Sequence, residues 1–181
     1  QSILDDIDEF LRQCVRTNRP EFMNPLWGGL NVAGFAGEVI AALTNQSMYT
    51  YELSPIATLI EQAIVERMME IVGYAEGFGT LTTGGSNGNM MGMLCARQAS
   101  HPMSSITGFD GSKYVAFVSA EAHYSVLMSA NVVGIGYQNL VKVACDSRGR
   151  MKPESLVEEI VRARTNGQTP FCISATSGTS V

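Results

Sequence analysis

Positive charge and long apolar runs are both scarce in this 181-residue sequence. Lys and Arg number 12 against 17 Asp and Glu, which gives a net charge of −5, and no basic cluster stands out. The sequence therefore lacks the electrostatic footprint of a nucleic-acid-binding protein. It has no run of about 18 apolar residues and no basic leader ahead of an apolar segment, so nothing indicates a membrane span or secretion. We expect a cytoplasmic protein with neither nucleic acid nor membrane as a partner.

Metal-ligand patterns are missing as well. The two histidines, His101 and His123, have no cysteine or carboxylate at metal-ligand spacing, so no metal site is predicted. The cysteines show no C-x-x-C spacing, and most lie in apolar segments. We expect them to be reduced thiols of the core; they are Cys14, Cys95, Cys145 and Cys172.

What the sequence does contain is a hydrophobic fraction of 45%, enough to bury a core. Its periodicity predicts a helix over 1–16, an irregular loop over 17–35, and a helix that Ser54 caps and Gly73 ends. Further on, helices and strands alternate. The predicted order is helix 87–98, strand 114–118, helix 122–131, strand 140–144, helix 153–164 and strand 171–175. Such alternation favours an α/β domain with a mainly parallel sheet.

A glycine-rich stretch, LTTGGSNGNMM over residues 81–91, runs into the helix predicted at 87–98. Ser86 in this stretch has three interpretations. Its hydroxyl could cap the helix, or it could join the backbone N–H groups of the glycines in holding an anion at the helix N-terminus. Alternatively, GGSNG could be a nucleophile elbow, with Asp110 and His123 completing a hydrolase triad. The third interpretation is disfavoured because residues 77–83 make a poor strand and the three residues crowd into one short segment.

A second group of polar residues follows the strand predicted at 114–118, where the sequence reads SAEAHYS. His123 there comes just after the carboxyl end of a buried strand, the place where open α/β sheets collect ligands. Thr179 and Ser180 follow the last predicted strand and would bring hydroxyls to the same edge. We therefore expect a ligand site that combines the glycine-rich stretch with His123.

Together these segments resemble the group II pyridoxal-phosphate-dependent decarboxylases, which act on glutamate, cysteine sulfinate and aromatic amino acids. The similar segments are GTLTTGGSNGNMMGMLCARQ, SAEAHYSV, CISATSGTSV, RPEFMNPLWGGLN, GEVIAALTNQSMYTYELSP and VERMMEIVGY. The resemblance implies the aspartate aminotransferase fold (fold type I), usually as a homodimer. It also implies that 1–53 form an N-terminal helix and a substrate-side, dimer-facing segment, and that 54–181 form the first half of the large cofactor-binding domain.

The resemblance assigns roles on the cofactor side. Gly85 and Ser86 match the pair that binds the phosphate of pyridoxal 5'-phosphate. His123 matches the residue whose imidazole stacks on the pyridine ring, and it is the candidate catalytic residue. Thr179 matches a strand-end threonine near the cofactor. Flat contact with an aromatic ring would orient the bond to be broken.

On the substrate side, Phe22 and Asn24 match a family segment that contacts the substrate. Tyr49 matches an aromatic residue that reaches into the neighbouring subunit's site. Where glutamate-type enzymes often read R-F-F-N-Q, this chain has Glu21 and Pro25 at the ends of the segment. Loss of the arginine and glutamine argues against an acidic substrate.

The family's Schiff-base lysine and its aspartate that pairs with the pyridine nitrogen would lie beyond Val181. The lysines present, Lys113, Lys142 and Lys152, stand in unlike contexts, and we interpret them as surface residues. We therefore expect a second chain or segment to supply lysine and aspartate and so to complete an amino acid decarboxylase. A non-catalytic decarboxylase-like subunit is the alternative, and a Ser86 hydrolase is a weaker one.

Overall fold

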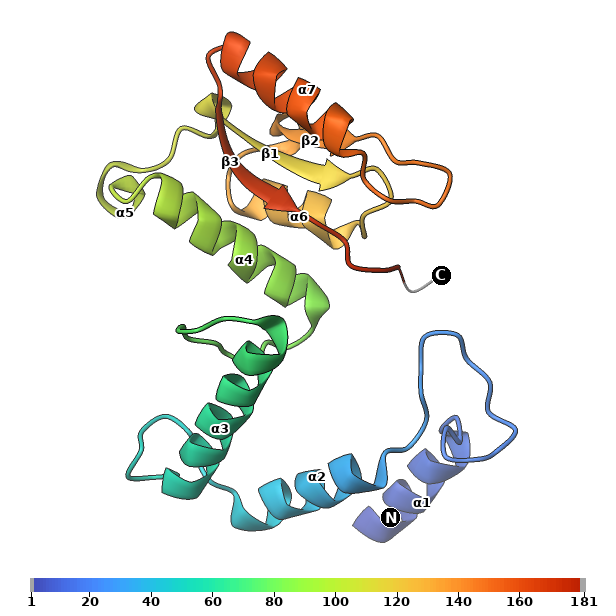
Figure 1. Ribbon diagram of the computed structural model, residues 1–181. Helices are drawn as coiled ribbons and strands as arrows, with labels where there is room; N and C mark the ends of the chain where they lie inside the picture. The colour runs from blue at the N-terminus through green and yellow to red at the C-terminus, as the bar shows by residue number, and fades with distance from the viewer. Residues whose placement is uncertain (1, 180–181) are drawn as a thin grey trace. The chain divides into compact units, whose positions relative to one another are not determined.

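The computed structural model describes residues 2–179 and contains two compact units (Figure 1). The first unit comprises the described residues up to Gly79, and the second is Thr80–Thr179. Among the residues described, the first unit is built from helices and loops, and the sheet lies in the second.

Helix α1, Ile3–Gln13, opens the first unit with a capping box. The Ser2 hydroxyl accepts a hydrogen bond from the Asp5 N–H, and the Asp5 carboxylate accepts one from the Ser2 N–H. Together these bonds satisfy two donors that a helix start leaves open. The prediction of a helix over 1–16 is confirmed in kind, but α1 ends earlier because Cys14 is extended.

Helix α2, Val32–Thr44, was not expected, since it begins inside the segment predicted to be irregular. The Asn31 side chain accepts a hydrogen bond of 2.8 Å from the Gly34 N–H, which makes it a helix cap. Gly34 and Gly37 lie inside this helix, and glycine is a poor helix former. The sequence pattern around its start was therefore interpreted as a loop. The helix ends at Asn45, which is left-handed with φ of +43°.

Helix α3, Pro55–Val72, confirms the predicted helix with its proline at the first position and Gly73 as its end. Gly73 has a φ of +94°, a left-handed conformation that favours glycine. The predicted role of Ser54 is wrong, because its side chain makes no capping bond. Instead, the buried Ser54 hydroxyl donates to Gln46 Oε1 at 2.9 Å and ties the preceding turn to the helix start.

The second unit is an α/β fold around three parallel strands in the order β2-β1-β3. All three strands confirm the predicted ones within a few residues. Phe117 of β1 is in register with Val141 of β2 and Ile173 of β3. The elements in chain order are α4 Gly85–Ser100, α5 Ser104–Thr107, η1 Gly111–Lys113, β1 Tyr114–Ser119, α6 Ser125–Val132, η2 Tyr137–Asn139, β2 Leu140–Val143, α7 Pro153–Thr165 and β3 Thr169–Ser174.

The core of the second unit has one layer on each face of the sheet. Successive side chains of a strand point to opposite faces, and β1 is apolar from Val115 to Val118 because both faces are covered. Ala116 and Val118 pack in the cluster beneath α4 and α6, whereas Val115 and Phe117 pack in the cluster beneath α7. Figure 1 shows these layers, with α7 on one side of the sheet and α4 and α6 on the other.

The four cysteines are free thiols, but they are not all core residues. Cys14 and Cys95 are exposed, whereas Cys145 and Cys172 are half-buried. The prediction of core thiols is therefore wrong for Cys14 and Cys95. Cys95 lies on α4, and only one side of that helix packs against the rest of the unit. An apolar helical pattern does not specify whether a given side chain lies on the buried or the exposed side.

The exposed cysteines should react faster than the half-buried ones. Burial raises the pKa of the Cys172 thiol, which lowers its thiolate fraction, and the thiolate is the reactive form. We expect Cys172 to be alkylated by iodoacetamide at neutral pH roughly tenfold more slowly than Cys95. Timed alkylation followed by mass spectrometry of the two peptides measures the ratio, and equal rates would contradict the burial of Cys172.

In the described part of the chain, no helix has both the length and the apolar character needed to cross a membrane. Nor do residues 2–179 bring together three or more His, Cys, Asp or Glu side chains in a group able to hold a metal ion.

Candidate functional site

The candidate site lies at the carboxyl edge of the sheet in the second unit. Because β1 and β3 are parallel, the segments that follow Ser119 and Ser174 leave the sheet at the same edge. His123 lies in the segment after β1, and Thr179 lies in the segment after β3. Thr179 is exposed. Ser180, which we expected to add a hydroxyl, lies outside the described residues.

The N-terminus of α4 provides a second part of the site. Gly84 precedes the helix with a φ of +148°, a conformation that side-chain-bearing residues rarely adopt, and no side chain caps the helix. Gly85 and Ser86 are the first two residues of the helix itself. The interpretation of Ser86 as a helix cap is therefore wrong, because the capping position belongs to Gly84.

This helix start fits a phosphate group. A helix N-terminus without a side-chain cap presents backbone N–H groups and the positive end of the helix dipole. Extra atoms at Gly84 or Gly85 would meet open space, so a ligand can approach the backbone closely. Ser86 is exposed and adds a hydroxyl in the same turn. Pyridoxal phosphate carries a dianion of the kind that this arrangement binds.

A hollow of about 240 Å³ joins the start of α4 to α6. Its walls include Ser86 and Met90 on α4, together with Tyr124 and Ser125 at the start of α6. The fold therefore brings the glycine-rich stretch beside the segment that carries His123. Sequence analysis predicted this proximity from the two motifs.

His123 is held on one edge by hydrogen bonds. Its Nδ1 accepts a bond of 3.2 Å from the Ser125 N–H and lies 2.8 Å from the Ser125 hydroxyl oxygen. The Asn89 side-chain amide donates to that same hydroxyl oxygen at 2.8 Å. The ring is exposed and lies 4.2 Å from the Tyr124 ring, centroid to centroid, at an interplanar angle of 37°. An exposed ring with a fixed edge is suited to contact with a flat ligand.

Asn89 and Ser125 were not among the predicted site residues. Ser125 lies in the SAEAHYS segment and Asn89 in the glycine-rich stretch. The two positions are far apart in sequence and meet because α4 packs on α6. One available signal was the spacing of His123 and Ser125, since a hydroxyl two residues after a histidine can reach its ring.

The structure does not form the hydrolase triad. Asp110 precedes β1 and His123 follows it, so a six-residue strand, about 20 Å long, separates them. The Asp110 carboxylate instead accepts bonds from Ser112 and pairs with Lys113 at 3.3 Å. Hydrogen bonds from Ser112 and the nearby Lys113 lower the pKa of Asp110. A triad also needs His123 Nδ1 to donate to the acid, and here Nδ1 accepts a hydrogen bond.

The three lysines are surface residues, as predicted. Lys113 has an exposed side chain paired with Asp110. Lys142 lies on β2 and Lys152 precedes α7, and both are exposed. None of the three follows the carboxyl end of β1 or β3, where the candidate site lies.

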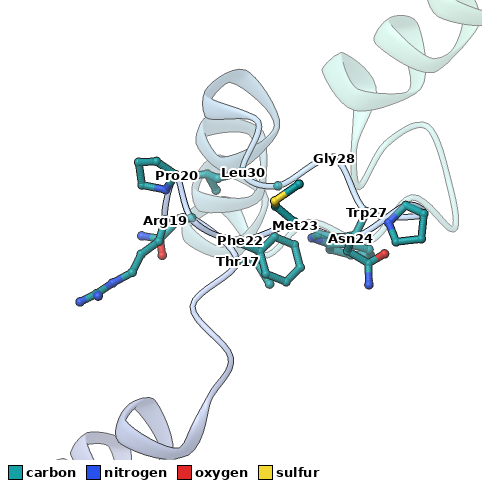
Figure 2. A pocket seen from close by; sticks show the side chains of 12 residues that line it. Thr17, Arg19, Pro20, Phe22, Met23, Asn24, Trp27, Gly28 and Leu30 are labelled. Carbon is teal, nitrogen blue, oxygen red and sulfur yellow. The ribbon is translucent and has the colours of Figure 1, made fainter.

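The predicted substrate-side residues all lie in the first unit. Figure 2 shows the loop over residues 17–30, which surrounds a hollow of about 800 Å³ with Phe22 and Asn24 among its walls. Asn24 Oδ1 accepts a bond of 2.8 Å from the Leu26 N–H. Met23 on the wall of this hollow is 92% exposed. Tyr49 is 89% exposed and lies outside this loop.

The chain matches known proteins along its whole length. Residues 1–181 match the family model described as the pyridoxal-dependent decarboxylase conserved domain. Acidic amino acid decarboxylase GADL1 of Mus musculus is 42% identical, over 96% of this chain and 33% of that protein. Cysteine sulfinic acid decarboxylase of Mus musculus is 37% identical, over 100% of this chain and 37% of that protein. The chain thus spans about a third of the length of these relatives.

Solved structures define the class of fold. The crystal structure of mouse CSAD in apo form superposes with a TM-score of 0.93 at 37% identity, over 99% of this chain and 38% of that one. This is the α/β fold of the aspartate aminotransferase type, as predicted. Given the family match over the entire sequence, the chain belongs to the pyridoxal-dependent decarboxylase family, whose cofactor is pyridoxal phosphate.

Proposed function

We propose that the protein containing these residues decarboxylates an L-amino acid to the corresponding amine and carbon dioxide, with pyridoxal phosphate as cofactor. The observation that carries the proposal is the pairing of an uncapped helix start, bearing Ser86, with the tethered ring of His123 in one part of the second unit. The first feature suits a phosphate and the second suits a flat ring. Pyridoxal phosphate has both.

The phosphate is assigned to the first turn of α4. Backbone N–H groups around Gly85 and the hydroxyl of Ser86 would donate hydrogen bonds to its oxygens, and the helix dipole adds to the attraction. Arg and Lys are absent from this turn, GSNG. Binding at this end of the cofactor therefore depends on neutral donors and the dipole.

The ring is assigned to His123 and Thr179. When bound, the cofactor supplies an electron-accepting ring that stabilises the charge left when carbon dioxide departs. His123 would lie flat against that ring and shield one face from water. Nε2 of the imidazole is the ring nitrogen that Ser125 does not engage, and in this proposal it would hold or move a proton. Thr179 would position the cofactor from the end of β3.

The proposed reaction also needs groups that we do not assign to this chain. We place the lysine that holds the cofactor, and the aspartate that pairs with the pyridine nitrogen, in a further chain or segment, because the three lysines of these residues are exposed on the surface. The completed unit is proposed to work as a cytoplasmic homodimer, with no nucleic acid or membrane as a partner. The exposed Tyr49 is proposed to reach the neighbouring subunit's site.

The substrate is proposed to contact Phe22 and Asn24. Relatives of the chain carry names that specify acidic substrates, namely acidic amino acids and cysteine sulfinic acid. Glu21 places a carboxylate next to Phe22, and like charges repel. We therefore expect acidic amino acids to be weaker substrates for this protein than for those relatives.

The experiment that tests the function uses the full-length protein incubated with pyridoxal phosphate. We expect a visible absorbance band from a cofactor–lysine imine, irreversible attachment of the cofactor by borohydride, and release of carbon dioxide from an L-amino acid. A non-catalytic decarboxylase-like protein would release no carbon dioxide from a full panel of amino acids. Absence of both the band and borohydride attachment would refute the cofactor assignment.

Replacing Ser86 with alanine should weaken cofactor binding. A hydrogen bond to a charged group is worth about 1.5–3 kcal/mol, which corresponds to a loss of affinity of roughly 10- to 100-fold. Equilibrium titration of the protein with pyridoxal phosphate, followed by absorbance, measures this loss.

Ser100→Ala is the matched control, since Ser100 is the last residue of the same helix. The control should retain the affinity of the unaltered protein. An unchanged dissociation constant in Ser86→Ala would remove Ser86 from the phosphate site.

A further inference from the structure

Asn89, Ser125 and His123 form a chain of hydrogen bonds that links α4 to the imidazole. The Asn89 amide donates to Ser125 Oγ at 2.8 Å, and Ser125 Oγ lies 2.8 Å from His123 Nδ1. Ser125 is 2% exposed, so water does not compete freely for its hydroxyl. Two separate helices thereby determine the surroundings of one ring nitrogen.

The Ser125 backbone determines the hydrogen on the ring. Its N–H group can only donate, and it donates to His123 Nδ1 at 3.2 Å. Nδ1 must therefore carry a lone pair, and in a neutral imidazole the hydrogen then resides on Nε2. This step does not depend on the orientation of the Asn89 amide.

The Ser125 hydroxyl reinforces the same assignment. A serine hydroxyl has one hydrogen to donate and accepts through its lone pairs. Because Oγ accepts from the Asn89 amide, its own hydrogen is available for His123 Nδ1. Ser129 in turn donates to the Ser125 carbonyl at 2.7 Å, which holds the first turn of α6 in place.

We propose that Asn89 and Ser125 are positioning residues that hold His123 in the tautomer with its hydrogen on Nε2. Asn89 orients the Ser125 hydroxyl. Ser125 then fixes the orientation of the imidazole, because its hydroxyl and its backbone N–H both donate to Nδ1. The ring then presents Nε2–H on the side away from α6. The chemical use of that hydrogen rests on the proposed function, whereas the tautomer itself does not.

The tautomer is measured by nitrogen NMR of the full-length protein labelled with ¹⁵N-histidine, at a pH where the ring is neutral and without added cofactor. His123 is assigned by the loss of its signals in His123→Phe. We expect Nδ1 to show the shift of an unprotonated nitrogen and Nε2 that of a protonated one. A His123 signal with the opposite assignment would overturn the proposal at once.

Ser125→Ala removes one of the two donors. The ratio of the Nε2–H to the Nδ1–H tautomer should fall roughly three- to tenfold, the effect of one neutral hydrogen bond. Ser125→Thr keeps a hydroxyl and should restore most of the ratio. Asn89→Ala should shift the ratio in the same direction by less, and it decides the question if Ser125→Ala does not fold.

Ser129→Ala is the matched control. Ser129 lies on the same helix and is also 2% exposed, but its hydroxyl bonds to the backbone and not to the ring. Its ratio should equal that of the unaltered protein. An unchanged ratio in Ser125→Ala and Asn89→Ala, or an equal fall in Ser129→Ala, would overturn the proposal.

Kinetics separate this inference from the proposed function. If both hold, kcat of Ser125→Ala should fall in proportion to the fraction of His123 that keeps its hydrogen on Nε2, with the affinity for pyridoxal phosphate unchanged. A fall in the ratio in a protein that gives no cofactor band refutes the function and leaves the tautomer assignment standing. In an active enzyme, a kcat that stays unaltered while the Nε2–H fraction measured by NMR falls several-fold would overturn the positioning role.

Discussion

Replacing His123 with alanine should lower kcat by about 10²- to 10⁴-fold, the contribution typical of a positioned acid or base. The variant loses both the flat surface against the cofactor and the ring nitrogen that can hold a proton. The affinity for pyridoxal phosphate should fall much less, because the phosphate contacts at α4 remain. Steady-state decarboxylation rates and a cofactor titration of the full-length protein measure the two quantities.

His101→Ala is the control for this prediction. His101 ends α4 and packs near the rings of Phe109 and Tyr114, at centroid distances of 6.4 and 6.0 Å. This is a packing role, so the rate per folded molecule should stay within a few-fold of the unaltered value. Equal rates in His123→Ala and the unaltered enzyme would exclude His123 from the chemistry.

Gly111→Ala should destabilise the second unit by at least about 3 kcal/mol, the upper range for overpacking. A Cβ at Gly111 would overlap the Gly134 carbonyl oxygen and come within 2.8 Å of Ile135 Cα. These are backbone atoms, and they cannot move aside as a side chain does. The Asn139 amide fixes the same region by donating to the Gly111 and Ile135 carbonyls at 3.2 and 2.9 Å.

The measurement is the midpoint of urea unfolding, and Gly92→Ala is the matched control. Gly92 lies within α4, and a Cβ there would meet open space. Alanine is favoured over glycine in a helix by about 0.8–1 kcal/mol, so the control should be slightly more stable. A midpoint for Gly111→Ala at or above that of the unaltered protein would show that the contact with Gly134 is not close.

The alternating half of the chain was predictable because its signals are local and strong. A strand buried on both faces, such as β1, must be apolar at every position, and Tyr114–Ser119 nearly is. Pro55 and Gly73 mark the start and end of α3 by their backbone restrictions alone. The place of His123 at the carboxyl edge followed from a general property of parallel sheets, whose loops gather ligands there.

What escaped prediction depends on contacts between distant residues or on competing partners. Ser54 stands where a cap belongs, yet its hydroxyl donates to Gln46. Ser86 was one candidate for a cap, but α4 starts at Gly85, two residues earlier than predicted, and Gly84 holds the capping position. The bond between Asn89 and Ser125 joins two helices, and sequence periodicity carries no information about such a pair.

The central claim is that the first turn of α4 and the His123 ring hold one molecule of pyridoxal phosphate. A crystal structure of the full-length protein with the cofactor bound tests it most directly. The account predicts phosphate oxygens within hydrogen-bond distance of Ser86 Oγ and the Gly85 backbone, with the pyridine ring against the imidazole of His123. A phosphate bound elsewhere, or a pyridine ring that does not contact His123, would contradict it.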